Sequence, residues 1–244
     1  MKRMTFTDFY GLDIVSSSRE EIDGFIKDCL ERDEKIKITT MNAQIAYFYL
    51  KDHSAAKAIS DSFVIPDGTG LSWALKRLNG VNIDRYPGVE IMYSLCEICS
   101  ELGKKAYILG GLEGVAQMAA VNLHQETGVE INGYRNGYFD IDKESQAICQ
   151  RIKESQADIL FVGLGAPRQE EWIYRFFEQT GCTLAVGVGG SLDIYANTAK
   201  RAPGWVQKAN LEWLYRILQH PIKKFKVIFQ IMSFVKQVLK GKKV

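Results

Sequence analysis

Apolar and polar positions along the chain alternate between two patterns. Short apolar runs rich in β-branched residues are followed by turns, many containing glycine, and then by segments with apolar residues at helical spacing. The strands expected from this pattern are 35–40, 63–65, 106–109, 159–162 and 183–186. The helices expected after them begin near Ala43, Leu71, Val115, Gln169 and Ser191. This repetition predicts an α/β fold with a Rossmann-like parallel sheet core covered by helices.

Most of the polar motifs lie where these expected strands end. In a parallel sheet with right-handed crossovers, ligands bind in a crevice at the carboxyl ends of the strands. The motifs at those ends are Thr40-Met41-Asn42, Pro66-Asp67-Gly68, Gly110-Gly111, Gly163-Leu164-Gly165-Ala166-Pro167 and Gly187-Val188-Gly189-Gly190. We therefore expect these loops to border a ligand crevice.

The pattern changes after Arg201-Ala202-Pro203. Pro203 can begin a helix, and 205–219 carries apolar residues at helical spacing. A second helix is expected from Ile222 to about Lys240, with its apolar side chains on one wide arc and a lysine-rich edge. These features are typical of a helix that lies in a membrane interface, and the alternative is a helix that docks on the core or joins two copies of the chain.

Composition and charge support a division of the chain at residue 195. The hydrophobic share of 46% excludes a disordered protein. Residues 196–244 contain eleven Lys and Arg but one acidic residue, for a charge of about +10, whereas residues 1–195 carry about −8. We expect a catalytic core over 1–195 and a basic amphipathic helical appendage over 196–244 that meets an anionic surface. The longest uncharged apolar stretch of the appendage, 227–235, is shorter than the roughly 20 residues that a membrane span needs.

Neither the cysteines nor the acidic motifs predict a metal site. The N-terminus lacks the apolar run of a signal peptide, so the five cysteines are expected to be reduced thiols in the cytosol. Cys96 and Cys99 lie within a helical pattern, which favours core packing over zinc. Asp140 and Asp142 imitate a metal-binding Asp-x-Asp motif, but we interpret them as the acidic first turn of a helix.

Some residues at the strand ends are candidates for chemistry. Asp67 follows an apolar strand, where α/β enzymes keep acids and bases, although an aspartate in a Pro-Asp-Gly sequence also suits a plain turn. Arg85 is a candidate for a diphosphate, which a guanidinium pairs bidentately, and the Gln169 amide is a candidate for a base or sugar. Backbone amides at glycine loops favour a phosphate-bearing ligand, and the glycines considered are Gly110, Gly111, Gly165 and Gly189.

The motifs taken in order resemble those of the WecG/TagA/CpsF family, glycosyltransferase family 26. The matching residues are Thr40-x-Asn42, Pro66-Asp67-Gly68-x-Gly70, Arg85-x-x-Gly88, Gly137-Tyr138-Phe139, Gly163-x-Gly165-Ala166-Pro167-x-Gln169-Glu170-x-Trp172, Gly187-Val188-Gly189-Gly190-x-x-Asp193, Arg201-Ala202-Pro203 and Leu211-Glu212-Trp213-Leu214-x-Arg216. The match covers nearly the whole chain, and the ordered set is far more specific than any one motif.

The resemblance implies an enzyme at the cytosolic face of the membrane that moves a sugar from a UDP-sugar to an undecaprenyl-diphosphate-linked sugar. Such enzymes serve the synthesis of wall teichoic acid linkers, enterobacterial common antigen or capsular polysaccharide. The family is inverting and metal-independent, so no cofactor is expected. By position, Asp67 resembles its general base, and Thr40 and Asn42 resemble its sugar-pocket residues. The positions that resemble its UDP contacts and its tail arginine are Arg85, Gln169 and Arg216.

The sequence departs from the family pattern at a few positions. Met41 stands where proline is common, and Glu90 stands where aspartate is frequent. Lys223 and Lys226 stand where we expect arginine, so they keep the charge but lose the bidentate fork that binds a diphosphate. These changes leave the reaction type intact and leave the donor sugar, which N-acetylmannosamine or another hexose would satisfy, and the acceptor open.

Two other functions remain as alternatives. A nicotinamide-dependent dehydrogenase would use the loop 110–114, but its glycine spacing is wrong for a dinucleotide fingerprint, and the chain has no P-loop motif either. A non-enzymatic binder would use the basic tail on nucleic acid or membrane, and the wide apolar arc favours lipid over nucleic acid. In solution the same arc would drive self-association into a homo-oligomer.

Overall fold

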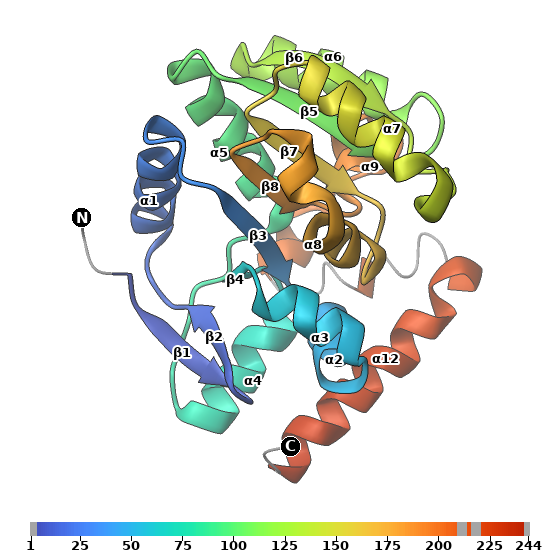
Figure 1. The fold of residues 1–244 in the computed structure, drawn as a ribbon. Coiled ribbons are helices and arrows are strands. Elements are labelled where there is room, and N and C mark those ends of the chain that lie inside the picture. The colour runs from blue at the N-terminus through green and yellow to red at the C-terminus, as the bar shows by residue number, and fades with distance from the viewer. Residues whose placement is uncertain (1–3, 209–213, 216–220, 242–244) are drawn as a thin grey trace.

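The computed structural model describes residues 4–208, 214–215 and 221–241. Its centre is an eight-stranded sheet with the order β1-β2-β4-β3-β8-β7-β5-β6. β1 (Phe6–Phe9) and β2 (Leu12–Val15) form an antiparallel hairpin, and all other neighbouring strands are parallel (Figure 1). The predicted α/β fold with a Rossmann-like parallel core is therefore confirmed.

The strands of the parallel core begin and end within a residue or two of the predicted ones. They are β3 (Ile36–Met41), β4 (Phe63–Pro66), β5 (Lys105–Gly110), β7 (Ile159–Gly163) and β8 (Leu184–Gly187). β6 (Glu130–Arg135) and the β1–β2 hairpin were not predicted. β6 lies at the sheet edge with half-exposed and exposed side chains, so its sequence lacks the apolar run of a central strand.

Helices cover both faces of the sheet. One face packs against α1 (Arg19–Glu31), α5 (Gly88–Glu101), α6 (Val115–Thr127) and α9 (Ser191–Tyr195). The other packs against α7 (Ile141–Glu154) and α8 (Arg168–Thr180), and towards the hairpin against α2 (Ala43–Lys51), α3 (His53–Ser60) and α4 (Thr69–Asn79). Successive strand residues serve opposite faces, as the neighbours Ile108 and Leu109 of β5 show by joining different clusters.

Two predictions are confirmed, the helix start at Asp140 and the core packing of Cys96 and Cys99. Asp140 caps α7 by accepting hydrogen bonds from the backbone N–H groups of Asp142 and Lys143, so the Asp-x-Asp sequence begins a helix. All five cysteines are buried free thiols, and Cys96 and Cys99 lie on α5 within the core.

The C-terminal helix α12 (Pro221–Lys240) docks on the core along one strip of its surface. It contacts α2 and α4, and it buries Phe234 and Val238 in the same cluster as Phe9 and Met41. The core-docking alternative therefore holds for this strip. The division of the chain at residue 195 into a core and a separately folding appendage stays a prediction.

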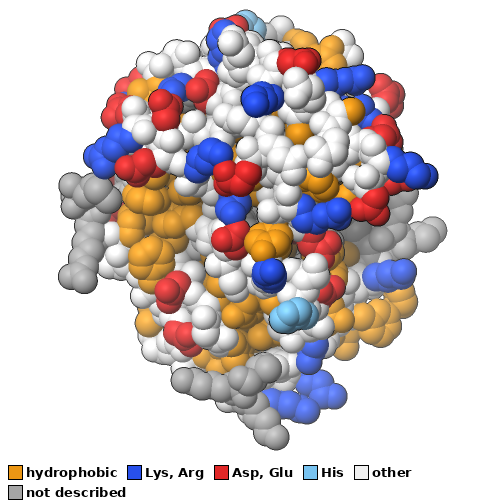
Figure 2. Space-filling model, in the orientation of Figure 1, with side chains coloured by type: hydrophobic (Ala, Val, Ile, Leu, Met, Phe, Trp, Pro, Cys, Tyr) orange, Lys and Arg blue, Asp and Glu red, His pale blue; other side chains and the backbone are white. Residues whose placement is uncertain are grey.

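A second strip of α12 remains exposed. Its large apolar side chains are Phe225, Phe229, Met232 and Leu239, each more than half exposed. On the face shown in Figure 2, hydrophobic and Lys or Arg side chains lie next to one another over the position of α12. The apolar arc predicted as one surface is thus divided between the core and the exterior.

Other predictions for the tail fall partly outside the described residues. The helix expected over 205–219 begins as α10 (Gly204–Lys208), and Arg216 lies outside the described part of the chain, as does the side chain of Lys223. Lys226 is exposed on α12. Within the described residues, every helix is too short or too polar to cross a bilayer.

Candidate active site

A cavity of about 660 Å³ lies at the carboxyl ends of β3, β4, β7 and β8. β3 and β8 are neighbours at the centre of the sheet, where its N-terminal and C-terminal halves meet. The expected crevice at the strand ends is therefore present. Of the described residues that line this cavity, two carry a charge, Asp67 and Arg85. The site combines one carboxylate and one guanidinium among polar, glycine and apolar neighbours.

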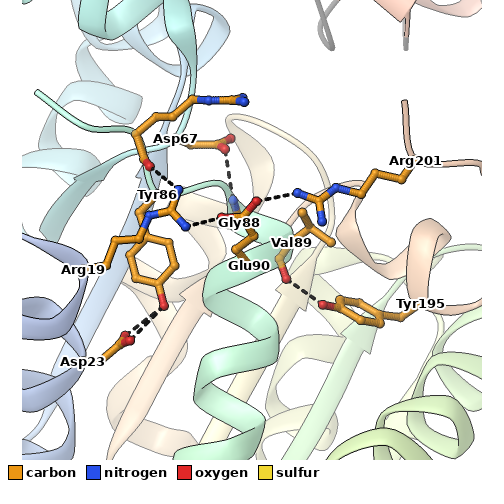
Figure 3. A network of polar contacts seen from close by, with 10 residues as sticks. Arg19, Asp23, Asp67, Tyr86, Gly88, Val89, Glu90, Tyr195 and Arg201 are labelled. Carbon is orange, nitrogen blue, oxygen red and sulfur yellow. Dashed lines mark hydrogen bonds and ion pairs between the residues drawn. The ribbon is translucent and has the colours of Figure 1, made fainter. Parts of the chain in front are cut away.

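Asp67 is held at the end of β4 by backbone bonds on both sides. Its N–H donates to the Met41 carbonyl at 2.9 Å, and its Oδ1 accepts from the Gly88 N–H at 3.0 Å (Figure 3). Gly88 is the first residue of α5, and the residue before it, Pro87, makes no side-chain capping bond. The Asp67 carboxylate thus takes the place of an N-cap, where the helix dipole favours a negative charge.

The glycines of the Pro-Asp-Gly-Thr-Gly sequence let the loop of Asp67 press against the start of α2. A Cβ on Gly68 would lie 3.0 Å from the Asn42 Cβ, and a Cβ on Gly70 would lie 2.9 Å from the Ala43 Cβ. Side chains at these two positions would therefore push the loops apart. Close backbone approach is what brings Asp67 and Asn42 to the same cavity.

Thr40 and Asn42 line the cavity, and both already make bonds within the protein. Asn42 caps α2, with its Oδ1 accepting from the Gln44 and Ile45 N–H groups. The buried Thr40 donates its hydroxyl proton to the Gly187 carbonyl at 2.8 Å. A sugar would therefore meet the Asn42 amide as a donor and the Thr40 oxygen as an acceptor.

Gln169 lines the cavity, but its amide is bonded within the protein. Its Oε1 accepts from the Gly189 N–H at 3.1 Å, and its Nε2 donates to Glu170 Oε1 at 2.8 Å. The side chain is 3% exposed. In this arrangement Gln169 holds the glycine loop after β8 in place. A direct bond from its amide to UDP stays a prediction, for which the second N–H of Nε2 is the available donor.

Glu170, next to Gln169 on α8, is a buried carboxyl group with one hydrogen-bonded oxygen. It is 3% exposed, and its Oε2 has no hydrogen-bond partner. Burial raises the pKa of Glu170 to about 7, against the opposing effect of the bond from Gln169. The group therefore titrates near neutral pH directly beside the residue that holds the Gly189 loop.

Glu170→Gln should stabilise the protein at pH 8 much more than at pH 4. Between about pH 4.5 and 7 the folded protein retains a proton that the unfolded chain has lost, so the free energy of unfolding of the wild type falls as pH rises through this window. Glutamine does not titrate, so the variant does not lose stability in this window. Its free energy of unfolding at pH 8 should exceed that of the wild type by on the order of 3 kcal/mol. Urea unfolding at both pH values measures it. Glu171→Gln, at a half-exposed position on the same turn, is the control, and equal gains in the two variants would contradict the assignment.

Two of the predicted phosphate-binding glycines do not line the cavity. Gly110 and Gly111 lie at the end of β5, where a Cβ on Gly110 would come within 2.4 Å of the Gly163 carbonyl oxygen. Packing between β5 and β7 explains the glycine at position 110, and the close approach of Val115 of α6, 2.6 Å from a Cβ on Gly111, explains the glycine at position 111. Gly165 and Gly189, in contrast, line the cavity as predicted, and substrate contacts by any of the four stay predictions.

The cavity also contains residues that the sequence analysis missed. Trp73 of α4 is 38% exposed and offers an aromatic face, and Ser191 at the start of α9 is buried. Trp73 follows Gly70 by one helical turn, a spacing that could have pointed to it. The apolar wall formed by Val227, Ile231 and Val235 depends on the docking of α12 and has no local signal.

Of the positively charged residues predicted to bind the diphosphate, the structure describes the side chains of Arg85 and Lys226, and they differ in position relative to this cavity. Arg85 lines it, whereas Lys226 does not. In the part of the chain that the structure describes, no group of three or more His, Cys, Asp or Glu residues is placed to hold a metal ion.

Comparison with known proteins identifies relatives over most of the chain. The model of the glycosyl transferase WecG/TagA/CpsF family matches residues 7–244. A Staphylococcus aureus (strain MW2) protein named N-acetylglucosaminyldiphosphoundecaprenol N-acetyl-beta-D-mannosaminyltransferase is 33% identical over 84% of this chain and 80% of its own length. A Bacillus subtilis (strain 168) protein of the same name is 30% identical over 88% of this chain and 86% of its own length. The chain therefore belongs to the WecG/TagA/CpsF family of glycosyl transferases.

Proposed function

We propose that this glycosyl transferase moves N-acetylmannosamine from a UDP-sugar to an N-acetylglucosaminyl-diphosphoundecaprenol acceptor. The acceptor and the transferred sugar are those in the names of the two relatives. The observation that carries the proposal is that the carboxylate of Asp67 and the guanidinium of Arg85 line a single cavity, and they are the two charged groups among its described residues. Inverting transfer needs both a base for the acceptor and a cation for the leaving diphosphate.

The reaction proceeds as one in-line displacement. An acceptor hydroxyl oxygen attacks the anomeric carbon of the donor while the bond from that carbon to the diphosphate breaks. Asp67 takes the hydroxyl proton, and the leaving UDP takes the electron pair of the broken bond. The bond from the Gly88 N–H to Asp67 Oδ1 limits rotation of the carboxylate, so that its orientation is set before the acceptor arrives.

The sugar and the diphosphate are held by different groups in this proposal. Thr40 and Asn42 contact the transferred sugar, and Trp73 offers a face on which a ring can stack. Arg85 and the loops at Gly165 and Gly189 face the diphosphate, and the Gly189 N–H reaches it only when its bond to Gln169 Oε1 is exchanged. Arg216, Lys223 and Lys226 are proposed to add positive charge when the tail is engaged.

The exposed strip of α12 supports attachment to the inner face of the cell membrane. Phe225 and Phe229 are each 59% exposed, with their ring centroids 5.0 Å apart, and Lys226, Lys236 and Lys240 are exposed on the same helix. Anionic lipid attracts each nearby lysine by about 1 kcal/mol, and apolar side chains add to this on insertion. Val227, Ile231 and Val235 of the same helix line the cavity, so a polyprenyl acceptor held in a membrane beneath α12 would have its sugar close to Asp67.

Replacing both exposed phenylalanines, Phe225→Ser with Phe229→Ser, should weaken binding to phosphatidylglycerol vesicles by about tenfold or more, because two large apolar side chains no longer insert. Vesicle sedimentation measures this. The matched control is Leu112→Ser, which changes a side chain that is 53% exposed before α6. Equal sedimentation of the double variant and the wild type would remove this strip as the membrane contact.

Product analysis tests the proposed function directly. The full chain is incubated with a panel of UDP-sugars and a synthetic lipid-linked N-acetylglucosaminyl diphosphate, and the product is identified by mass spectrometry. We expect UDP-N-acetylmannosamine to be the preferred donor and the anomeric configuration to invert. Preference for another hexose would correct the donor, and the absence of transfer from every donor would contradict the proposal.

A further inference from the structure

Side chains on two sides of the segment from Arg85 to Glu90, which includes the first turn of α5, hold it in place. The buried Tyr86 donates its hydroxyl proton to Asp23 of α1, and its N–H donates to the Pro66 carbonyl at 2.6 Å. From the other side, the Tyr195 hydroxyl of α9 donates to the Val89 carbonyl at 2.7 Å (Figure 3). The turn that supplies the N–H group for Asp67 is therefore fixed by side chains from two other helices.

Glu90 connects these two sides. One carboxylate oxygen pairs with Arg19 of α1, and the other pairs with Arg201, which lies between α9 and α10. Figure 3 shows the two guanidinium groups approaching the same carboxylate from opposite directions. Arg19 also donates to the Arg85 carbonyl at 2.9 Å. The network thus reaches the backbone of the cavity arginine as well as the turn below Asp67.

Gly88 connects this turn to the cavity through close contacts on both sides. Its N–H donates to Asp67, and a Cβ at this position would lie 3.3 Å from the Thr40 hydroxyl oxygen. A small shift of the turn therefore moves the partner of Asp67 and the surface against which Thr40 packs. Displacements of about 1 Å are enough to lower a catalytic rate a hundredfold.

We propose that Glu90 is a positioning residue for glycosyl transfer, because its two ion pairs fix the turn that carries the Gly88 N–H and with it the Asp67 carboxylate. This inference rests on the proposed function, in which Asp67 is the base. Glu90 itself does not line the cavity at the strand ends. It acts through α5, and its effect falls on turnover.

A purely structural role would affect stability instead. The side chains of Glu90, Arg19 and Arg201 are 29%, 43% and 34% exposed, and ion pairs at such partly exposed positions contribute little to the free energy of folding. Loss of the network should therefore leave the protein folded. Its consequence should be found in the geometry of the site.

The test compares Glu90→Gln with a matched pair at the far end of the same two helices. Lys27 of α1 pairs with Glu101 of α5, as Arg19 pairs with Glu90, but at the end of α5 remote from Asp67. We expect Glu90→Gln to lower kcat about tenfold or more, with KM for the UDP-sugar within about threefold and the melting temperature within a few degrees. Glu101→Gln should keep the wild-type kcat. Glu90→Asp keeps the charge, so its kcat should lie between those of Glu90→Gln and the wild type. Arg201→Gln removes one of the two partners of Glu90 and should also lower kcat.

Several results would overturn the inference. These are a kcat of Glu90→Gln within twofold of the wild type, an equal loss in Glu101→Gln, or a loss that follows a large drop in melting temperature. A crystal structure of Glu90→Gln that retains the bond between Gly88 and Asp67 would do so whatever the activity. The wild-type protein in the same assay separates the two proposals. If the wild type shows no turnover, the proposed function fails, whereas the role of Glu90 in holding the Gly88–Asp67 bond is still tested by the crystal structure of Glu90→Gln.

Discussion

Asp67→Asn should lower kcat by about two orders of magnitude or more while the protein stays folded and binds UDP, because a positioned general base contributes roughly 10²–10⁴-fold. The structure explains why the fold should tolerate the change. Asparagine keeps an oxygen that can accept from the Gly88 N–H, now at 3.0 Å from Asp67 Oδ1. What is lost is the ability to take a proton from the acceptor hydroxyl.

Steady-state kinetics with the lipid-linked acceptor, together with calorimetric titration of UDP, measures both parts of this result. Asp84→Asn is the matched control, since Asp84 is an exposed neighbour of Arg85 that does not line the cavity. An Asp67→Asn variant with near-normal turnover would show that another group accepts the proton. A variant that no longer binds UDP would show that Asp67 serves the fold of the site and would leave the base unassigned.

Phe234→Ala should destabilise the protein by about 3–5 kcal/mol, the range for truncation of a buried phenylalanine. Phe234 is 1% exposed on α12, and its ring centroid lies 6.2 Å from that of Phe9 in the N-terminal hairpin. It shares one apolar cluster with Met41 of β3, directly before Asn42. Loss of the ring leaves a cavity below the candidate active site.

Urea unfolding measures the change, and Phe229→Ala is the matched control on the same helix. Phe229 is 59% exposed, so its truncation should alter the free energy of unfolding by no more than about 0.5 kcal/mol. Similar small effects of both variants would mean that α12 does not dock on the core in solution. The pair also separates anchoring from packing, because membrane binding should respond to Phe229 and stability to Phe234.

The local sequence was sufficient for the parallel core and for most of the loops that border the cavity, although the predicted Gly110-Gly111 loop does not line it. The runs of β5 and β7 are apolar and buried on both faces of the sheet, and β3 is rich in β-branched isoleucine and threonine, so these local patterns mark all three as strands. Asp67, Thr40 and Asn42 follow such runs, and the carboxyl ends of parallel strands share one edge of the sheet. Their convergence on a cavity follows from this rule. β6 escaped prediction because an edge strand with half-exposed residues has no comparable pattern.

What the sequence by itself determined is the α/β class, the strand–loop–helix order and most of the loops that border the cavity, because each depends on neighbours within a few positions along the chain. The tertiary structure decided which groups those loops meet. Gly110 proved to be a packing glycine because of Gly163, and Gln169 proved to be bonded to Gly189. Glu90 meets Arg19 and Arg201 across 71 and 111 positions. Likewise, an amphipathic arc shows that α12 needs an apolar partner, but only packing of the folded chain shows which strip the core buries and which strip remains exposed.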